Sequence, residues 1–196
     1  ARREPSLAWV VTQGAAELAW IGVGGDPVWS AEVLDDPLGS SASTHAGLGT
    51  LRLDPVGGAD FGADRFGTVS GTWGFDTGAT SATWIGGLVI VDREDDDPER
   101  RTDGIPELRV AWVPADRATI IEDWDSTGLR GTGSHSVSID QQRIPWRWTV
   151  AWHEPTANQR GPHRVMVGNG NWSIAASVAA VQLGTARAAL DEAVRL

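Results

Sequence analysis

The segment Ser70-Gly-Thr-Trp-Gly-Phe-Asp-Thr-Gly-Ala-Thr-Ser-Ala-Thr-Trp84 places three aromatic residues among glycines and small hydroxyl residues. An apolar run, residues 85–91, follows it directly. Aromatic faces offer stacking area to a planar ligand, and threonine hydroxyls and backbone N–H groups satisfy heteroatoms at its edge. The same composition is typical of an aromatic β-hairpin that fills a hydrophobic core. Two interpretations of this segment therefore stand side by side, a ligand face and core packing.

Short apolar runs separated by glycine, proline, aspartate and serine extend on both sides of this segment. They lie at residues 48–53, 66–69, 83–91, 107–114, 118–122 and 134–144. In residues 136–140 the apolar Val137 and Ile139 alternate with polar neighbours, which is the period of a half-buried strand. Regularly spaced strands of this kind predict a β-sandwich or a β-barrel.

Helical patterns flank these strands. Residues 6–21 form a periodic apolar segment, with Ser6 as its expected N-cap and residues 22–27 as its stop, and a short helical turn is expected at residues 28–32. Residues 171–196 predict a longer helix, with Asn171 as a possible cap. Its alanine-rich apolar stripe needs a partner to cover it: Ile174, Val178, Val181, Ala186, Ala189 and Leu190. Residues 155–170 predict a polar connector.

The composition excludes several classes of function. The formal net charge is −10 and no basic stripe is present, which argues against a nucleic-acid binder. The chain has no cysteine, which excludes disulfides and thiolate metal sites. All 16 basic residues are arginine, which excludes lysine nucleophiles and Schiff bases. No apolar run approaches membrane-spanning length and no signal-peptide core follows Arg2 and Arg3, so we expect a cytoplasmic protein without a membrane partner. The chain begins without methionine, so we expect a fragment or a processed product.

Two further patterns bear on metal binding. Residues 92–101 are rich in acidic side chains but lack the ligand spacing of a calcium loop, so a solvated hairpin tip is the preferred interpretation. The four histidines, His45, His135, His153 and His163, have no pair at the helical spacing of a metal site. We therefore expect no metal.

A second unusual segment is Trp124-Asp-Ser-Thr-Gly-Leu-Arg-Gly-Thr-Gly-Ser134. In it Arg130, Thr132 and Ser134 alternate with glycines, which places a fixed cation and two hydroxyls beside unobstructed backbone N–H groups. This chemistry suits the polar or anionic edge of a ligand. The alternative is a tight turn into the strand at residues 136–144, with Arg130 in solvent.

In order along the chain, these pieces resemble the acyl-CoA dehydrogenase superfamily, and more closely its branch of two-component flavin-dependent monooxygenase oxygenase subunits. The resemblance covers nearly the whole chain. It rests on the segments Ser70-Gly-Thr-Trp73, Thr77-Gly78, Ala82-Thr-Trp84, residues 124–134, Arg143-Ile-Pro145, and the Ala189-Leu-Asp-Glu-Ala193 helix.

The resemblance implies an α+β, mainly β fold, with an antiparallel β-barrel flanked by an N-terminal helix and a C-terminal helix of an incomplete bundle. Residues 1–32 would end an N-terminal helical domain, and residues 33–150 would form the flavin-binding barrel. Residues 151–170 would be a connector, and residues 171–196 would open a truncated C-terminal helical domain. The catalytic residue of the family is expected in that C-terminal domain, so we expect the fragment itself to be inactive.

The resemblance also implies a cofactor, FAD or FMN, and residues that hold it. Phe75 falls where the family places an aromatic ring against the flavin. Thr77, followed by Gly78, falls where it places a hydroxyl near flavin N5, which tunes the cofactor. The segment Pro37-Leu-Gly-Ser-Ser41 resembles an earlier loop on the flavin side, which adds Ser40 and Ser41.

The resemblance implies that the parent protein hydroxylates a small aromatic molecule and that a flavin reductase is its partner. It also implies a homo-oligomer, which would be a tetramer in the parent. Two alternatives remain. One is α,β-dehydrogenation of an acyl thioester by an acyl-CoA dehydrogenase proper. The other is a non-catalytic β-sandwich binding module, which would present Trp73, Trp84 and Trp112 coplanar and exposed on one sheet face.

Overall fold

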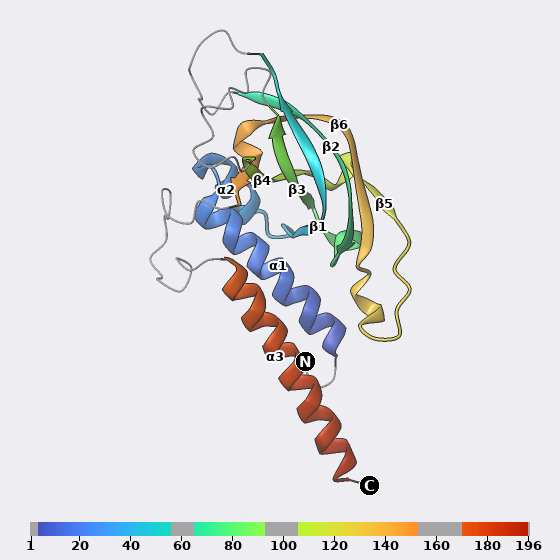
Figure 1. Ribbon diagram of the computed structural model, residues 1–196. Helices are drawn as coiled ribbons and strands as arrows, with labels where there is room; N and C mark the ends of the chain where they lie inside the picture. The colour runs from blue at the N-terminus through green and yellow to red at the C-terminus, as the bar shows by residue number, and fades with distance from the viewer. Residues whose placement is uncertain (1–3, 56–64, 93–105, 153–169, 196) are drawn as a thin grey trace.

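The computed structural model describes residues 4–55, 65–92, 106–152 and 170–195. In these residues the chain is α+β, with three helices against a seven-stranded sheet (Figure 1). The helices are α1 (Pro5–Gly24), α2 (Pro27–Asp35) and α3 (Gly170–Ala193). The strands are β1 (Ser41–Leu53), β2 (Phe66–Asp76), β3 (Trp84–Asp92), β4 (Leu108–Pro114), β5 (Thr119–Ile121), β6 (His135–Pro145) and β7 (Thr149–Ala151). The expected acidic hairpin tip and the connector fall largely outside the described residues.

The strand order is β5-β6-β2-β1-β3-β4-β7. β1 pairs in parallel with β3, and the other described pairs are antiparallel. The sheet is therefore mixed, and the expectation of an antiparallel sheet was wrong at β1–β3. The cause is the connection after β2, which crosses the start of β1 to reach its other edge. Hydrogen bonds from Thr83 N to Ser40 O (3.0 Å) and from Ser40 N to Thr83 Oγ1 (2.9 Å) fix this crossing.

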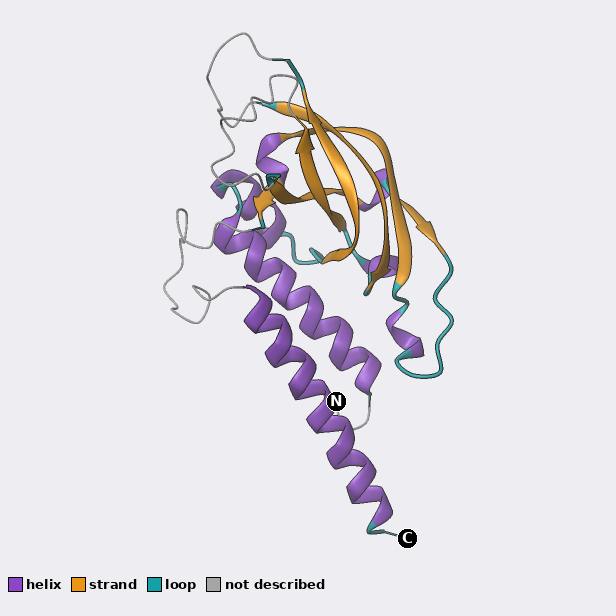
Figure 2. Ribbon diagram, viewed as in Figure 1, coloured by secondary structure: helices purple, strands orange, loops and turns teal. Residues whose placement is uncertain are grey.

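The sheet is strongly curved (Figure 2). Val137 and Ile139 of β6 share one buried cluster with Ala111 and Val113 of β4, although three strands separate β6 from β4 in the sheet order. The edge strands β5 and β7 are not paired with each other among the described residues. Closure into a barrel is therefore not confirmed, and it stays a prediction.

The helices match the sequence pattern in type but not in their caps. Helix α1 starts one residue earlier than expected and ends three residues later. Its N-cap is Glu4 and Ser6 lies inside the helix, so the prediction of Ser6 as the N-cap was wrong. α2 is a full helix rather than a turn, because Asp26 caps it: its Oδ1 accepts the N–H of Val28 (2.9 Å) and of Trp29 (3.3 Å). In α3, Asn171 lies within the helix.

Replacing Asp26 by alanine is expected to lower the free energy of unfolding by about 1 kcal/mol, because two N–H groups at the start of α2 lose their acceptor. Urea denaturation followed by circular dichroism measures this loss. Asp26→Asn is the matched control, since asparagine is as good an N-cap as aspartate. Equal stability of the alanine variant and the wild type would contradict the capping role.

Two hydrophobic clusters lie on opposite faces of the sheet. The first, inside the curve, contains Leu51, Val69, Trp73, Ile85 and Ile144 among others. The second packs the C-terminal end of α1 and helix α2 onto the sheet, through residues Ile21, Trp29, Val33, Trp84, Val110, Trp112 and Val150. Helix α1 is thereby held along the first half of β1, and this placement positions the site described next.

Helix α3 packs beside α1 (Figure 1). This contact buries Val181 of the predicted apolar stripe, whereas Ala186, Ala189 and Leu190 are exposed. Helix α1 therefore covers only part of the stripe. None of the described helices combines the length and apolarity that crossing a bilayer requires.

Candidate functional site

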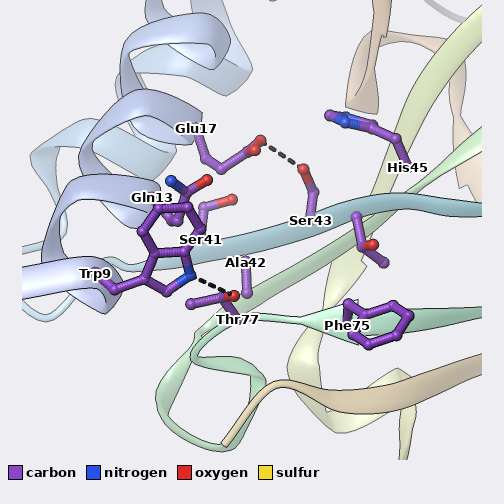
Figure 3. Close-up of a pocket in the computed structure, with 10 residues that line it drawn as sticks. Trp9, Gln13, Glu17, Ser41, Ala42, Ser43, His45, Phe75 and Thr77 are labelled. Carbon is purple, nitrogen blue, oxygen red and sulfur yellow. Dashed lines mark hydrogen bonds between the residues drawn. The ribbon is translucent and has the colours of Figure 1, made fainter. Parts of the chain in front are cut away.

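A cavity of about 160 Å³ lies between α1, the first half of β1 and the end of β2 (Figure 3). Side chains from α1 face side chains from β1 across it. Its lining residues are Trp9, Gln13, Glu17, Ser41, Ala42, Ser43, Thr44, His45, Phe75 and Thr77. Three residues predicted from the sequence, Ser41, Phe75 and Thr77, therefore line one cavity.

Phe75 lies at a local irregularity of the sheet. The β2–β6 register shifts between Trp73 and Asp76, and Phe75 there has a positive φ of 61°. A positive φ is uncommon for a bulky residue and persists only where the surroundings enforce it. The shift turns Trp73 and Asp76 inward and leaves Phe75 66% exposed, with an edge-to-face contact to Trp124. An aromatic face beside the cavity is thus free to stack on a planar ligand.

A chain of hydroxyl groups connects the two segments that the sequence singled out. Thr77 Oγ1 lies 2.9 Å from Ser134 Oγ, which lies 2.7 Å from Thr132 Oγ1. Trp9 Nε1 of α1 donates to Thr77 Oγ1 (3.2 Å). Thr132 and Ser134 are buried. The fold therefore brings Thr77, predicted to contact the flavin, together with Thr132 and Ser134, predicted at the edge of a polar ligand. Their contact with a ligand stays a prediction.

In this series of hydroxyl groups, the number of available protons determines which group donates to which. Thr132 donates its single hydroxyl proton to Leu129 O (2.9 Å), so Ser134 must donate to Thr132. Ser134 then has no proton left, and Thr77 donates to Ser134. Thr77 therefore presents a lone pair, not a proton, to the cavity. A ligand atom that meets this oxygen has to be a hydrogen-bond donor.

Arg130 stands apart from the hydroxyl chain. Its guanidinium pairs with Asp125 (3.1 Å), and both side chains are exposed. An exposed ion pair of this kind contributes little to stability, so Arg130 is available to an outside anion. Its predicted role at the edge of a ligand is untested, and it does not line the cavity.

Ser40, Ser41 and Gly78 have structural partners inside the protein. Ser40 Oγ donates to Ser81 O (2.9 Å), and the buried Ser41 Oγ accepts from Trp112 Nε1 (3.1 Å). Gly78 has a φ of 81°, which favours glycine, and its N–H donates to Thr132 O (3.1 Å). The Ser40 and Gly78 contacts hold the loop that carries Thr77. Their role as flavin contacts stays a prediction.

Sequence reasoning missed the ionisable groups of this region. Glu17 is 5% exposed, and its Oε2 accepts a hydrogen bond from Ser43 (2.5 Å). Asp76 is fully buried, and neither carboxylate oxygen has a partner among the described residues. A signal was present, because Glu17 is the only charged residue within α1. A lone acid in an apolar helix faces either solvent or a site, and here it faces the cavity.

Burial shifts the pKa values of all three ionisable groups here. It raises the pKa of Glu17 to about 7, against the opposing effect of the Ser43 hydrogen bond. It raises the pKa of Asp76 to about 8, and the charge of Glu17 adds to this effect. It lowers the pKa of His45 to about 4, so that this imidazole is neutral at pH 7. The described residues contain no group of three or more potential metal ligands.

The three tryptophans proposed for an exposed platform are buried. Trp73, Trp84 and Trp112 are 1%, 8% and 0% exposed. They belong to two clusters on opposite faces of the sheet, Trp73 to the first and the other two to the second. This arrangement contradicts the exposed tryptophan surface that a β-sandwich binding module would need.

Comparison with known proteins finds no matching family model. The chain is 32% identical over 129 residues to the indole-3-acetate monooxygenase of Pseudomonas putida, an alignment that covers 63% of this chain and 29% of that protein. It is 34% identical over 80 residues to the oxygenase subunit HsaA, a flavin-dependent monooxygenase of Rhodococcus jostii, covering 40% and 18%. The aligned part is thus under a third of either relative's length.

Solved structures share the fold of the chain. XiaF from Streptomyces sp., in complex with FADH2 and glycerol, has a TM-score of 0.76 and 24% identity, covering 99% of this chain and 46% of that one. KijD3, in complex with FMN and a dTDP-sugar, has a TM-score of 0.67 and 23% identity, covering 99% and 46%. Both sequence relatives are monooxygenases, and HsaA is a flavin-dependent oxygenase subunit, the kind of protein that the sequence resembles. The chain spans less than half the length of these structures.

Proposed function

We propose that this chain is the flavin-binding part of the oxygenase subunit of a flavin-dependent monooxygenase that hydroxylates a small aromatic molecule. The observation that carries the proposal is the hydroxyl chain Thr77–Ser134–Thr132, which lies beside the exposed ring of Phe75. The identity of the sequence relatives supports oxygen insertion over dehydrogenation of an acyl thioester. The flavin, FAD or FMN, would supply the chemistry that activates oxygen.

The residues present suit a flavin ring. Phe75 would stack on its face, since this side chain is 66% exposed beside the cavity. Thr77 would accept a hydrogen bond from an N–H group at the edge of the ring, because its own proton is directed to Ser134. Trp9 would hold Thr77 in this orientation through its indole N–H. Reduced flavin carries a hydrogen on N5, whereas N5 of oxidised flavin is only an acceptor. Because Thr77 accepts a hydrogen bond at this edge, the arrangement favours the reduced form.

The remaining expectations belong to the same proposal. A flavin reductase would supply reduced cofactor, and the assembly would be a homo-oligomer in the cytoplasm. The group that moves protons during hydroxylation would come from the C-terminal helical domain, as the resemblance implies. The cavity beside α1 would receive the substrate, since Phe75 and Thr77 line one end of it.

Anaerobic titration of the chain with FMN and FAD, each in both redox states, tests this proposal. We expect reduced flavin to bind more tightly than oxidised flavin, and Thr77→Val to weaken the binding of reduced flavin about tenfold through loss of one hydrogen bond. Phe75→Ala should weaken both forms. Ser134→Ala should release the Thr77 proton and reduce the preference for the reduced form.

Thr119→Val is the matched control, because Thr119 is exposed on the edge strand β5, away from the cavity. The proposal fails if neither flavin binds. It fails equally if the Phe75 and Thr77 variants bind flavin as tightly as the control.

A further inference from the structure

Two buried carboxyl groups lie at the cavity beside α1, and once they ionise, no described lining residue balances their charge. Glu17 and the neighbouring Asp76 are 5% and 0% exposed, and the charge of one raises the pKa of the other. The only basic side chain among the lining residues, His45, is neutral at pH 7. Isolated buried carboxylates are costly unless a cation or several donors meet them.

Polar groups around the cavity also lack partners. Gln13 and His45 line the cavity, and the Nε2 atom of each is buried without a hydrogen bond among the described residues. Both oxygens of Asp76, which does not line the cavity but lies near Glu17, are unpaired in the same part of the chain. Buried polar atoms in folded proteins nearly always have a partner, and an unpaired one costs stability. Four such atoms in one region indicate that a ligand supplies the missing partners.

We infer that this cavity is a subsite for a compact cationic amine, whose ammonium group binds Glu17 and is attracted by the nearby Asp76. This inference rests on the proposed function and names the class of substrate for it. The volume of about 160 Å³ limits the occupant to roughly one aromatic ring with a short arm, since an engineered cavity of about 150 Å³ holds benzene. Gln13 and His45 lie on either side of Glu17 in the lining (Figure 3). An ammonium group only donates hydrogen bonds, so His45 would accept through an unprotonated ring nitrogen and Gln13 through its amide oxygen.

The sign of the charge decides between ligands of equal size. An ammonium group gains Coulomb energy from both carboxylates, whereas a carboxylate ligand is repelled by both. A neutral hydroxyl gains only an ordinary hydrogen bond. Hydrogen bonds to charged groups are about twice as strong as neutral ones, so the amine should bind about tenfold or more tightly than the matching alcohol.

Isothermal titration calorimetry of the chain at pH 8 with benzylamine, benzyl alcohol and benzoate tests this order on three probes that share one ring. We expect benzylamine to bind most tightly and benzoate most weakly. Glu17→Gln keeps an acceptor for Ser43 but removes the charge, so it should lower benzylamine affinity about tenfold and change benzyl alcohol binding little. Glu32→Gln, on the exposed face of α2, is the control.

The pH dependence separates this role from a structural one. Glu17 faces His45 of β1 and Asp76 of β2, and it is the only charged residue of α1 itself. His45 stays neutral between pH 6 and pH 8, whereas both carboxyl groups lose protons. Benzylamine should therefore bind more tightly at pH 8 than at pH 6, and Glu17→Gln should reduce this difference.

The order of the three affinities in the wild-type protein already tests the inference, so the test does not depend on whether any variant folds. Benzoate binding as tightly as benzylamine, no benzylamine binding, or an unchanged benzylamine advantage in Glu17→Gln would each overturn it. Flavin titration of the same protein keeps the two proposals distinct. Amine selectivity without flavin binding would sink only the proposed function, and flavin binding without amine selectivity would sink only this subsite.

Discussion

Replacing Gly87 by alanine is expected to lower the free energy of unfolding by about 3 kcal/mol. A Cβ atom at Gly87 would lie 2.3 Å from the indole ring of Trp73, and at Gly49 and Gly71 it would lie 2.4 Å and 2.6 Å from the same ring. Trp73 is 1% exposed and donates its indole N–H to Leu88 O (2.8 Å). The ring is held between β1, β2 and β3, so it cannot move away without losing this bond.

Chemical denaturation of Gly87→Ala measures this loss. Gly128→Ala is the control, since nothing lies within 4 Å of a Cβ there and the backbone needs no positive φ. In Trp73→Leu the smaller side chain leaves room for the added methyl group, so Gly87→Ala should cost much less in that background. If Gly87→Ala is as stable as the Gly128→Ala control, the close packing of Gly87 against the Trp73 ring does not constrain the core as proposed.

The second large effect is a fall in stability as the pH rises from 6.5 to 8.5, by about 3 kcal/mol. Burial raises the pKa of Glu17 to about 7 and of Asp76 to about 8, so the native state holds protons that the unfolded chain has already released. Their stabilising contribution is complete below the unfolded pKa values, near 4, and is lost as the pH rises through 7 and 8.

His45 acts in a different pH window. Burial lowers its pKa to about 4, so its contribution is present above 6.5 and is lost as the pH falls toward 4. The interval from pH 6.5 to 8.5 therefore isolates the two carboxyl groups.

Urea unfolding at pH 6.5, 7.5 and 8.5 measures the effect. Asp76→Asn mimics the protonated side chain and should remove about 2 kcal/mol of the fall, since Asp76 has the larger shift. Asp140→Asn, an exposed aspartate of β6, should leave the fall intact. A wild-type stability that is flat over this interval, or a fall of equal size in Asp76→Asn, would show that Asp76 is already ionised in the native state.

Local patterns predicted the elements that depend on local interactions. The alternation at Val137 and Ile139 lies in β6, and the periodic segments at both ends form α1 and α3. Strand β7 was missed because three residues carry too little pattern, and α2 was underestimated because the Asp26 cap was not recognised. The sequence motifs also pointed to Thr77, Thr132 and Ser134, which the fold brings into one hydroxyl chain.

The sequence by itself determined the α+β class, the separate segments of the site and the resemblance to flavin-dependent monooxygenases, because these depend on residue order and short-range periodicity. Only the tertiary structure decided the parallel pairing of β1 with β3, the proton direction that makes Thr77 an acceptor, and the meeting of Glu17 with Asp76. Each of these depends on contacts between residues far apart in the chain, which no local pattern encodes. In the opening segment, residues 70–84, Trp73 fills the core, as the core-packing interpretation predicts. Phe75 and Thr77 line the cavity, and their contact with a ligand stays a prediction.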